Sequence, residues 1–219
     1  RDLHSFPTRR SSDLAITYYG SVFGGGSGYY PYETTNGHDW LRSAGTVFGN
    51  TNITITGGHI LTGVYGGNET TDVGTYTNNA QVVPVVKVSG GKCTINMTGG
   101  TIGVPRTEAH IEARPISCSL FGAGKGDHRT YFNTWTNVNE VEVNISGGII
   151  YGSVFGGGEE GHVLRDVKMN ISDGAKIGTH GTTENEGNVF GGGRGYSGMA
   201  LTAGSTGGNA NISISGGDS

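Results

Sequence analysis

The sequence contains little of what cross-links a chain, binds a metal through thiolates or crosses a membrane. Its 219 residues include only two cysteines and five prolines. Cys93 and Cys118 are too few for a disulfide framework and lack the spacing of metal ligands, so we expect both to be buried as small apolar side chains. No apolar run approaches the roughly 18 to 20 residues that span a bilayer, so no membrane span is predicted.

Positive charge is also scarce. The chain has 14 Lys and Arg residues against 18 Asp and Glu residues, and its formal net charge is −4 at pH 7. Domains that bind nucleic acid carry an excess of basic residues, which neutralise phosphates. The acidic balance therefore argues against nucleic acid as a partner.

The first fourteen residues, RDLHSFPTRRSSDL, contain no glycine and differ from everything that follows. Arg9, Arg10 and Asp13 interrupt any apolar core, so the segment is not a secretory signal, and its acids argue against a transit peptide. Back-translated, it resembles a common short-read sequencing adapter, in frame throughout. We therefore expect residues 1–14 to be an artefactual, non-native leader and residues 15–219 to be a single repeat segment with variable loop insertions.

Glycine, by contrast, is abundant: 43 residues, or about a fifth of the chain, against an ordinary usage of roughly 7%. No three-residue collagen period is present, so the glycines serve a longer repeat. Paired glycines align five copies of one block: TNITITGG (51–58), CTINMTGG (93–100), VEVNISGG (141–148), VKMNISDG (167–174) and ANISISGG (210–217).

Within each copy, apolar residues alternate with Thr, Ser or Asn. One apolar column holds Ile53, Ile95, Val143, Met169 and Ile212, and the column two residues on holds Ile55, Met97, Ile145, Ile171 and Ile214. Alternation at period two predicts a strand with one face buried and one face solvated. The glycines then turn the chain.

A second block places an aromatic residue before glycines, as in SVFGGG (21–26) and GVYGGN (63–68). Its column holds Phe23, Tyr65, Phe121, Phe155 and Phe190. The two blocks alternate along the chain, and insertions of variable length separate them. This pattern predicts an all-β fold, a parallel β-solenoid (β-helix) with stacked ladders of like side chains. We expect it to be right-handed, as known β-helices are, and to be a fragment truncated at both ends.

The alternation of N-[IM]-[TS]-G-G with V-[FY]-G-G-G resembles the glycine-rich repeats of large parallel β-helix proteins that gut Bacteroidetes secrete or display at their surface. The resemblance covers nearly all of residues 15–219. It implies an extracellular or outer-surface location and a theme of adhesion. It implies no catalytic residue, because the repeat contains none.

Three glycine-rich stretches are similar to nucleotide-binding motifs. GGGEEG (156–161) and GRGYSG (193–198) match the dinucleotide fingerprint, and GAGKGD (122–127) approaches a phosphate-binding loop. The fingerprint requires a helix after it, and none is predicted; the loop lacks the G-K-[ST] ending. We interpret all three as corners of the repeat, and no cofactor is expected.

Two insertions are rich in aromatic residues, which suit wet binding surfaces and stacking on sugars. These candidate ligand-binding residues are Tyr29, Tyr30, Tyr32, Trp40, Tyr131, Phe132 and Trp135. The alternative is that both insertions fold back over the outer wall of the solenoid.

Histidines recur beside acids, at His38 with Asp39, at Asp127 with His128, and at Glu159 and Glu160 with His162. A metal site needs three or four converging ligands, so we interpret these as solvated polar loops and predict no metal.

The sequence thus favours a structural or adhesive segment of a bacterial surface or secreted protein, whose loops bind polysaccharide or a host surface protein. The alternative is a polysaccharide lyase or hydrolase. Its clustered candidates are Arg165, Asp166, Lys168 and Asp173. Asp173 replaces a corner glycine, where a carboxylate more often makes a turn hydrogen bond, so no catalytic residue is assigned.

Overall fold

The computed structural model describes residues 20–34, 37–40, 44–77, 86–105, 118–126, 136–178, 187–195 and 203–216. Within these ranges the chain is all-β, as predicted, and most of its sheets are parallel. The same residues include no helix that is long and apolar enough to cross a membrane. The expected leader, residues 1–14, lies outside the described residues.

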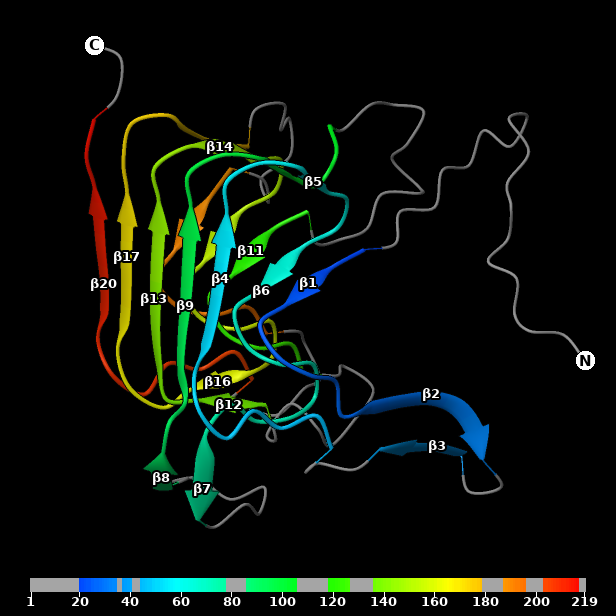
Figure 1. The fold of residues 1–219 in the computed structure, drawn as a ribbon. Coiled ribbons are helices and arrows are strands. Elements are labelled where there is room, and N and C mark those ends of the chain that lie inside the picture. Colours follow the sequence, from blue (N-terminus) through cyan, green and yellow to red (C-terminus); the bar gives the residue numbers. More distant parts are fainter. Residues whose placement is uncertain are drawn as a thin grey trace, which may run out of the picture.

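Strands of the first block form one five-stranded parallel sheet, the long-strand sheet (Figure 1). Its members, in order of pairing, are β4 (Thr51–Ile55), β9 (Lys92–Met97), β13 (Glu140–Ile145), β17 (Val167–Ile171) and β20 (Ala210–Ile214). Ile95 pairs with Ile53 on one side and with Val143 on the other. The predicted alignment of the columns is therefore confirmed.

The second block forms the aromatic sheet, in which five two-residue strands pair in parallel. They are β1 (Val22–Phe23), β6 (Val64–Tyr65), β11 (Leu120–Phe121), β15 (Val154–Phe155) and β19 (Val189–Phe190). Neighbouring rings stack with interplanar angles of 2° to 14° and centroids 4.7 to 5.2 Å apart. Each pair adds about 0.5–1.5 kcal/mol beyond its buried area, so the predicted aromatic column is a stabilising feature.

Shorter parallel sheets complete the repeat. The corner sheet contains β5 (His59–Ile60), β10 (Thr101–Ile102), β14 (Gly148–Ile150) and β18 (Ala175–Ile177). A two-stranded sheet joins β12 (Asn137–Val138) and β16 (His162–Val163). Between aromatic-sheet strands the chain therefore runs through the long-strand sheet and then the corner sheet.

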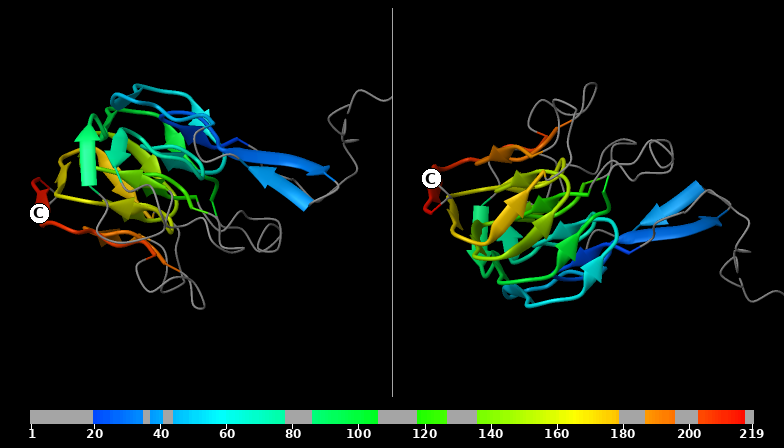
Figure 2. Two further views of the ribbon diagram at one scale, coloured as in Figure 1. Left: turned by 90° about the horizontal axis from the view of Figure 1, so that it is seen from below. Right: turned by 90° about the horizontal axis from the view of Figure 1, so that it is seen from above.

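Two antiparallel hairpins interrupt this order. The first pairs β2 (Tyr29–Thr34) with β3 (Gly37–Trp40), and the second pairs β7 (Thr75–Thr77) with β8 (Val86–Ser89). The β2–β3 hairpin extends away from the parallel sheets in every view (Figures 1 and 2). Its backbone therefore does not run along the outer face of the long-strand sheet.

Aliphatic side chains of the parallel sheets meet in one core cluster, and Tyr65, Phe121 and Phe155 form a second. Ile95, Met97, Val143 and Met169 are fully buried, and each such side chain contributes about 1.5–3 kcal/mol by leaving water. The expected burial is wrong for the last strand, because Ile214 is 66% exposed. The reason is that β20 pairs only with β17 among the described strands.

Two kinds of glycine turn the corners. Glycines that end the first block, such as Gly58 and Gly100, have φ near +85° to +90°, a region that side chains disfavour. Glycines that follow the aromatic residue serve close approach instead. A Cβ on Gly66 would lie 2.1 Å from the carbonyl oxygen of Gly122, and a Cβ on Gly122 would lie 2.4 Å from that of Gly156.

Polar side chains on the outer face of the long-strand sheet also stack. The Asn170 amide donates to Oδ1 of Asn144 at 2.7 Å, and the Asn144 amide donates to Oδ1 of Asn96 at 2.9 Å. The Lys92 ammonium lies 2.6 Å from Glu142 and lowers the pKa of that carboxyl. Surface pairs of this kind contribute little, so the buried columns dominate stability.

Candidate functional site

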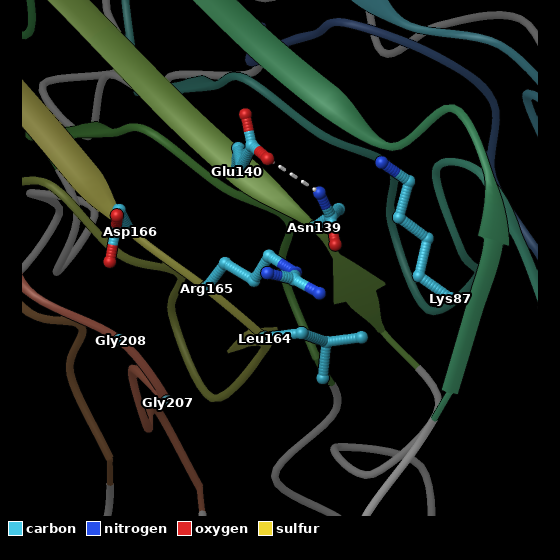
Figure 3. Close-up of a pocket in the computed structure, with 8 residues that line it drawn as sticks. All are labelled: Lys87, Asn139, Glu140, Leu164, Arg165, Asp166, Gly207 and Gly208. Atoms are coloured by element: carbon cyan, nitrogen blue, oxygen red, sulfur yellow. Dashed lines mark hydrogen bonds between the residues drawn. The ribbon is translucent and has the colours of Figure 1, made fainter.

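A hollow of about 530 Å³ opens where the chain enters the long-strand sheet (Figure 3). Its lining residues are Lys87, Asn139, Glu140, Leu164, Arg165, Asp166, Gly207 and Gly208. Three consecutive repeats contribute, through the start of β13 and the segments before β17 and β20, and β8 adds Lys87. The hollow is therefore a product of stacking, since no single repeat contains it.

Backbone hydrogen bonds align these three segments. The amide of Arg165 donates to the carbonyl of Asn139 at 2.9 Å, and the amide of Gly208 donates to the carbonyl of Arg165 at 3.1 Å. A Cβ on Gly208 would lie 2.4 Å from Oδ1 of Asp166. Glycine at this position thus leaves room for the Asp166 carboxylate.

Charges of both signs line the hollow. Lys87 and Arg165 are cations with exposed side chains, and Glu140 and Asp166 are carboxylates. Figure 3 shows Arg165 extending between Asn139 and Leu164, and Lys87 extending from the neighbouring β8.

The two carboxylates are positioned by hydrogen bonds. The Asn139 amide donates to Oε1 of Glu140 at 3.0 Å, and the backbone amide of Asn209 donates to Oδ1 of Asp166 at 2.7 Å. Leu164 is the apolar residue of the lining. This mixture of donors and acceptors suits a ligand with many hydroxyl or amide groups.

The four residues considered for catalysis do not converge. Arg165 and Asp166 line the hollow at the start of β17, whereas Asp173 follows its end. At about 3.3 Å per residue, the intervening strand separates the two aspartates by roughly 20 Å. Lys168 is exposed on β17 itself. Asp166 and Asp173 therefore cannot act on one bond, which requires groups a few Å apart.

A second polar cluster lies beside the aromatic sheet. It includes the stretches GGGEEG (156–161) and GAGKGD (122–127), which the sequence predicted to be corners of the repeat. Successive repeats contribute alternating charges: Glu69, Lys125, Glu159 and Arg194. Nη2 of Arg194 lies 2.5 Å from Oε1 of Glu159, and Nζ of Lys125 lies 3.5 Å from Glu69. The Arg194 guanidinium also lies 5.1 Å from the centre of the Phe121 ring. These charges thus pair along the corner, and the Arg194 guanidinium lies over the aromatic stack.

The interpretation of Glu159, Glu160 and His162 as a solvated loop is wrong. All three are buried, with 7%, 2% and 5% of their surface exposed. Nδ1 of His162 lies 2.9 Å from the Ser205 hydroxyl, one repeat further on. Stacking of the next repeat over this corner removes it from water, which the residue types alone do not indicate.

The candidate aromatic residues divide between two regions. Tyr29, Tyr30 and Tyr32 lie on β2 and Trp40 on β3, with Tyr29 and Trp40 paired in the ladder. Tyr131, Phe132 and Trp135 lie outside the described residues, as do Asp127 and His128. His38 and Asp39 are on β3.

Both cysteines are free and buried, as expected. Cys93 is fully buried, and this burial raises the pKa of its thiol to about 12. Within the described part of the chain, no group of three or more His, Cys, Asp or Glu residues is arranged to hold a metal ion.

Comparison with known proteins identifies no relative: no family model, curated protein or solved structure matches the chain.

Proposed function

We propose that the chain is a right-handed parallel β-solenoid segment of a bacterial cell-surface or secreted protein, with a structural or adhesive role. The observation that supports this proposal most directly is the register of the parallel sheets, in which equivalent residues of five repeats pair with one another. Such ladders make a continuous scaffold, because each repeat buries the apolar face of its neighbour.

Insertions enter this scaffold without disturbing its pairing. The β2–β3 hairpin lies between β1 and β4, yet both strands keep their in-register partners β6 and β9. Loops held on a rigid framework carry binding more often than the framework itself. We therefore propose that the insertions, together with the hollow beside β8, contact a polysaccharide or a host surface protein.

A glycan array tests the adhesive role. Wild type should be retained on at least one polysaccharide, and Trp40→Ala, Trp135→Ala or Arg165→Ala should each reduce retention without lowering the melting temperature. Lys176→Ala is the matched control, because Lys176 is an exposed cation on β18 in the corner sheet, apart from the hollow and the hairpins. Retention that is absent in wild type, or unchanged in all three variants, would contradict glycan binding.

A polysaccharide lyase or hydrolase is the second candidate function, and one observation favours it. Val141 pairs with Val167, so the preceding residues Glu140 and Asp166 occupy adjacent positions in the hollow. Adjacent strands lie about 4.8 Å apart, so the backbones of these two acidic residues are neighbours, and retaining glycosidases use two carboxyl groups about 5–5.5 Å apart. Release of soluble sugar that disappears in both Glu140→Gln and Asp166→Asn, while binding persists, would establish this activity.

A further inference from the structure

Arg165 is the charged member of a column of stacked residues at the entry to the long-strand sheet. The column runs through Gly49, Gly91, Asn139, Arg165 and Gly208, and each backbone amide after the first donates to the carbonyl of the residue before it, at 2.7 to 3.1 Å. Arg165 has described neighbours on both sides, so its exposure is not that of a sheet edge. Its long side chain stands among positions that offer little or no side chain to pack against.

The two cations of the hollow, Lys87 and Arg165, have no acidic partner among the described residues. The ion pairs of that part of the chain lie elsewhere, on the outer face of the long-strand sheet and beside the aromatic sheet. Figure 3 shows the Arg165 side chain extending away from Asp166, its neighbour in sequence, and toward the side of the hollow where Lys87 lies. The donors of both cations are therefore available to a ligand in the hollow.

The two acids of the hollow differ from its cations in this respect. Glu140 accepts a hydrogen bond from the Asn139 side chain at 3.0 Å, and Asp166 accepts one from the backbone amide of Asn209 at 2.7 Å. The chain thus supplies each carboxylate with a donor, whereas it supplies the guanidinium and the ammonium with no carboxylate. The group that would complete the hollow is an anionic acceptor.

We propose that the hollow binds a carboxylate-bearing sugar of an acidic polysaccharide, with Arg165 and Lys87 contacting the sugar carboxylate. A guanidinium presents two parallel N–H donors that match the two oxygens of a carboxylate, and an ammonium adds a point charge. Glu140 and Asp166 accept from the sugar hydroxyls, because a carboxylate has more acceptor positions than one donor occupies. The volume of about 530 Å³ falls within the range of small-ligand sites.

This inference rests on the proposed function, since its ligand is a polysaccharide, and it adds the charge of that polysaccharide. A general attraction between the protein and polyanions would not explain such binding, because the formal net charge of the chain is −4 at pH 7. Like charges repel over distances of about a Debye length, roughly 8 Å at physiological salt. Retention of an acidic polysaccharide therefore requires a local cationic site.

Retention of the full chain on immobilised polysaccharides tests the charge of the ligand. Polygalacturonate should retain wild type about tenfold more strongly than its methyl ester, because esterification removes the negative charge and leaves the sugar backbone unchanged. Equal retention on the two polymers would overturn this inference and leave the adhesive role intact, and retention on no polysaccharide would overturn both. Dextran sulfate and dextran identify the kind of anion: stronger retention on dextran sulfate than on polygalacturonate would overturn the assignment to a carboxylate.

Variants of the two cations test the site itself. Arg165→Gln and Lys87→Gln should each weaken retention on polygalacturonate by about tenfold, and Arg165→Lys should recover only part of it, because it restores the charge without the paired donors. Both side chains are exposed, so the melting temperature should not change. Lys176→Gln is the matched control, because Lys176 is an exposed cation on β18 that does not line the hollow. An equal loss in Lys176→Gln would refute the site.

Variants of the two acids should have the opposite effect. Glu140→Gln and Asp166→Asn each remove a negative charge beside the sugar carboxylate while keeping the shape of the side chain, so retention on polygalacturonate should increase. The methyl ester measures what the same variants do to contacts with hydroxyl groups alone. Weaker retention on polygalacturonate in both variants would mean that the acids contact a cationic group of the ligand, and would overturn the proposal.

Discussion

Tyr65 and Glu159 lie 94 residues apart in the chain, yet the Tyr65 hydroxyl donates a 2.5 Å hydrogen bond to Oε2 of Glu159. Tyr65 is the one member of the aromatic column that carries a hydroxyl; the other four are phenylalanines. Arg194 donates to the second oxygen of the same carboxylate. The buried Glu159 is thus held between a phenol and a guanidinium from different repeats.

Replacing Tyr65 by Phe should therefore destabilise the fold by about 1.5–3 kcal/mol, because the buried Glu159 carboxylate loses a donor. Urea unfolding measures this change. Glu159→Gln and the double variant complete a double-mutant cycle, which should give a coupling energy above about 0.5 kcal/mol. A Tyr65→Phe protein as stable as wild type would show that the contact contributes nothing.

An aspartate in the apolar column should be tolerated at its exposed end and not in its centre. Ile145→Asp places a charge in a dry core and should cost several kcal/mol, enough to prevent folding. Ile214→Asp makes the same change in the same column at a side chain that is 66% exposed, and should cost less than about 1 kcal/mol. Circular dichroism and thermal melting compare them. Equal losses would contradict the burial pattern.

Three glycine-to-alanine changes should lower the stability of the fold by different amounts, because the added methyl group meets a different obstacle at each position. Gly57→Ala should be neutral within about 0.5 kcal/mol, since no atom lies within 4 Å of the added methyl. Gly58→Ala has equal space but a φ of +85°, and should cost about 1–2 kcal/mol. Gly122→Ala should cost more than about 3 kcal/mol, because its methyl collides with a neighbouring carbonyl. Denaturant midpoints that fall in another order would refute this assignment.

Stability should decline at alkaline pH through Cys93. Burial raises its thiol pKa from an ordinary value of 9.0 to about 12, so unfolding releases a proton above pH 9. This contribution is fully present below pH 9 and is lost as pH rises toward 12, at up to about 1.4 kcal/mol per pH unit. Urea unfolding between pH 7 and 11 checks it, and Cys93→Ala should flatten the slope. An identical slope in that variant would assign the decline to other groups.

Periodicity predicted the columns well, and its success has a physical reason. Side chains alternate across a strand, and parallel in-register pairing repeats that alternation in every neighbour. Ile95 and Phe121 could thus be placed beside their partners from the pattern alone. The exposure of Ile214 and Phe190 depends on whether a further strand covers them. The alternation of residues within one strand gives no information about its neighbours.

The hollow was not predicted, because its residues differ in type from repeat to repeat. A signal was nevertheless present. The residue before each long-strand block is Asn50, Lys92, Glu140, Asp166 or Asn209, so the alignment already contained a polar column there. Burial of Glu160 and His162 was missed for another reason, since it depends on the packing of a repeat that follows an insertion.

The unequal spacing of the paired strands also bears on how the chain folds. Val141 reaches its partner Val167 after 26 residues, whereas Cys93 reaches Val141 after 48. Closing the longer loop costs only about 0.5 kcal/mol more, because closure entropy grows with the logarithm of loop length. Closure entropy therefore favours the pairing of β13 with β17 only slightly over the other pairings. Insertions can consequently lengthen or change at small energetic cost, while the ladders that they connect persist.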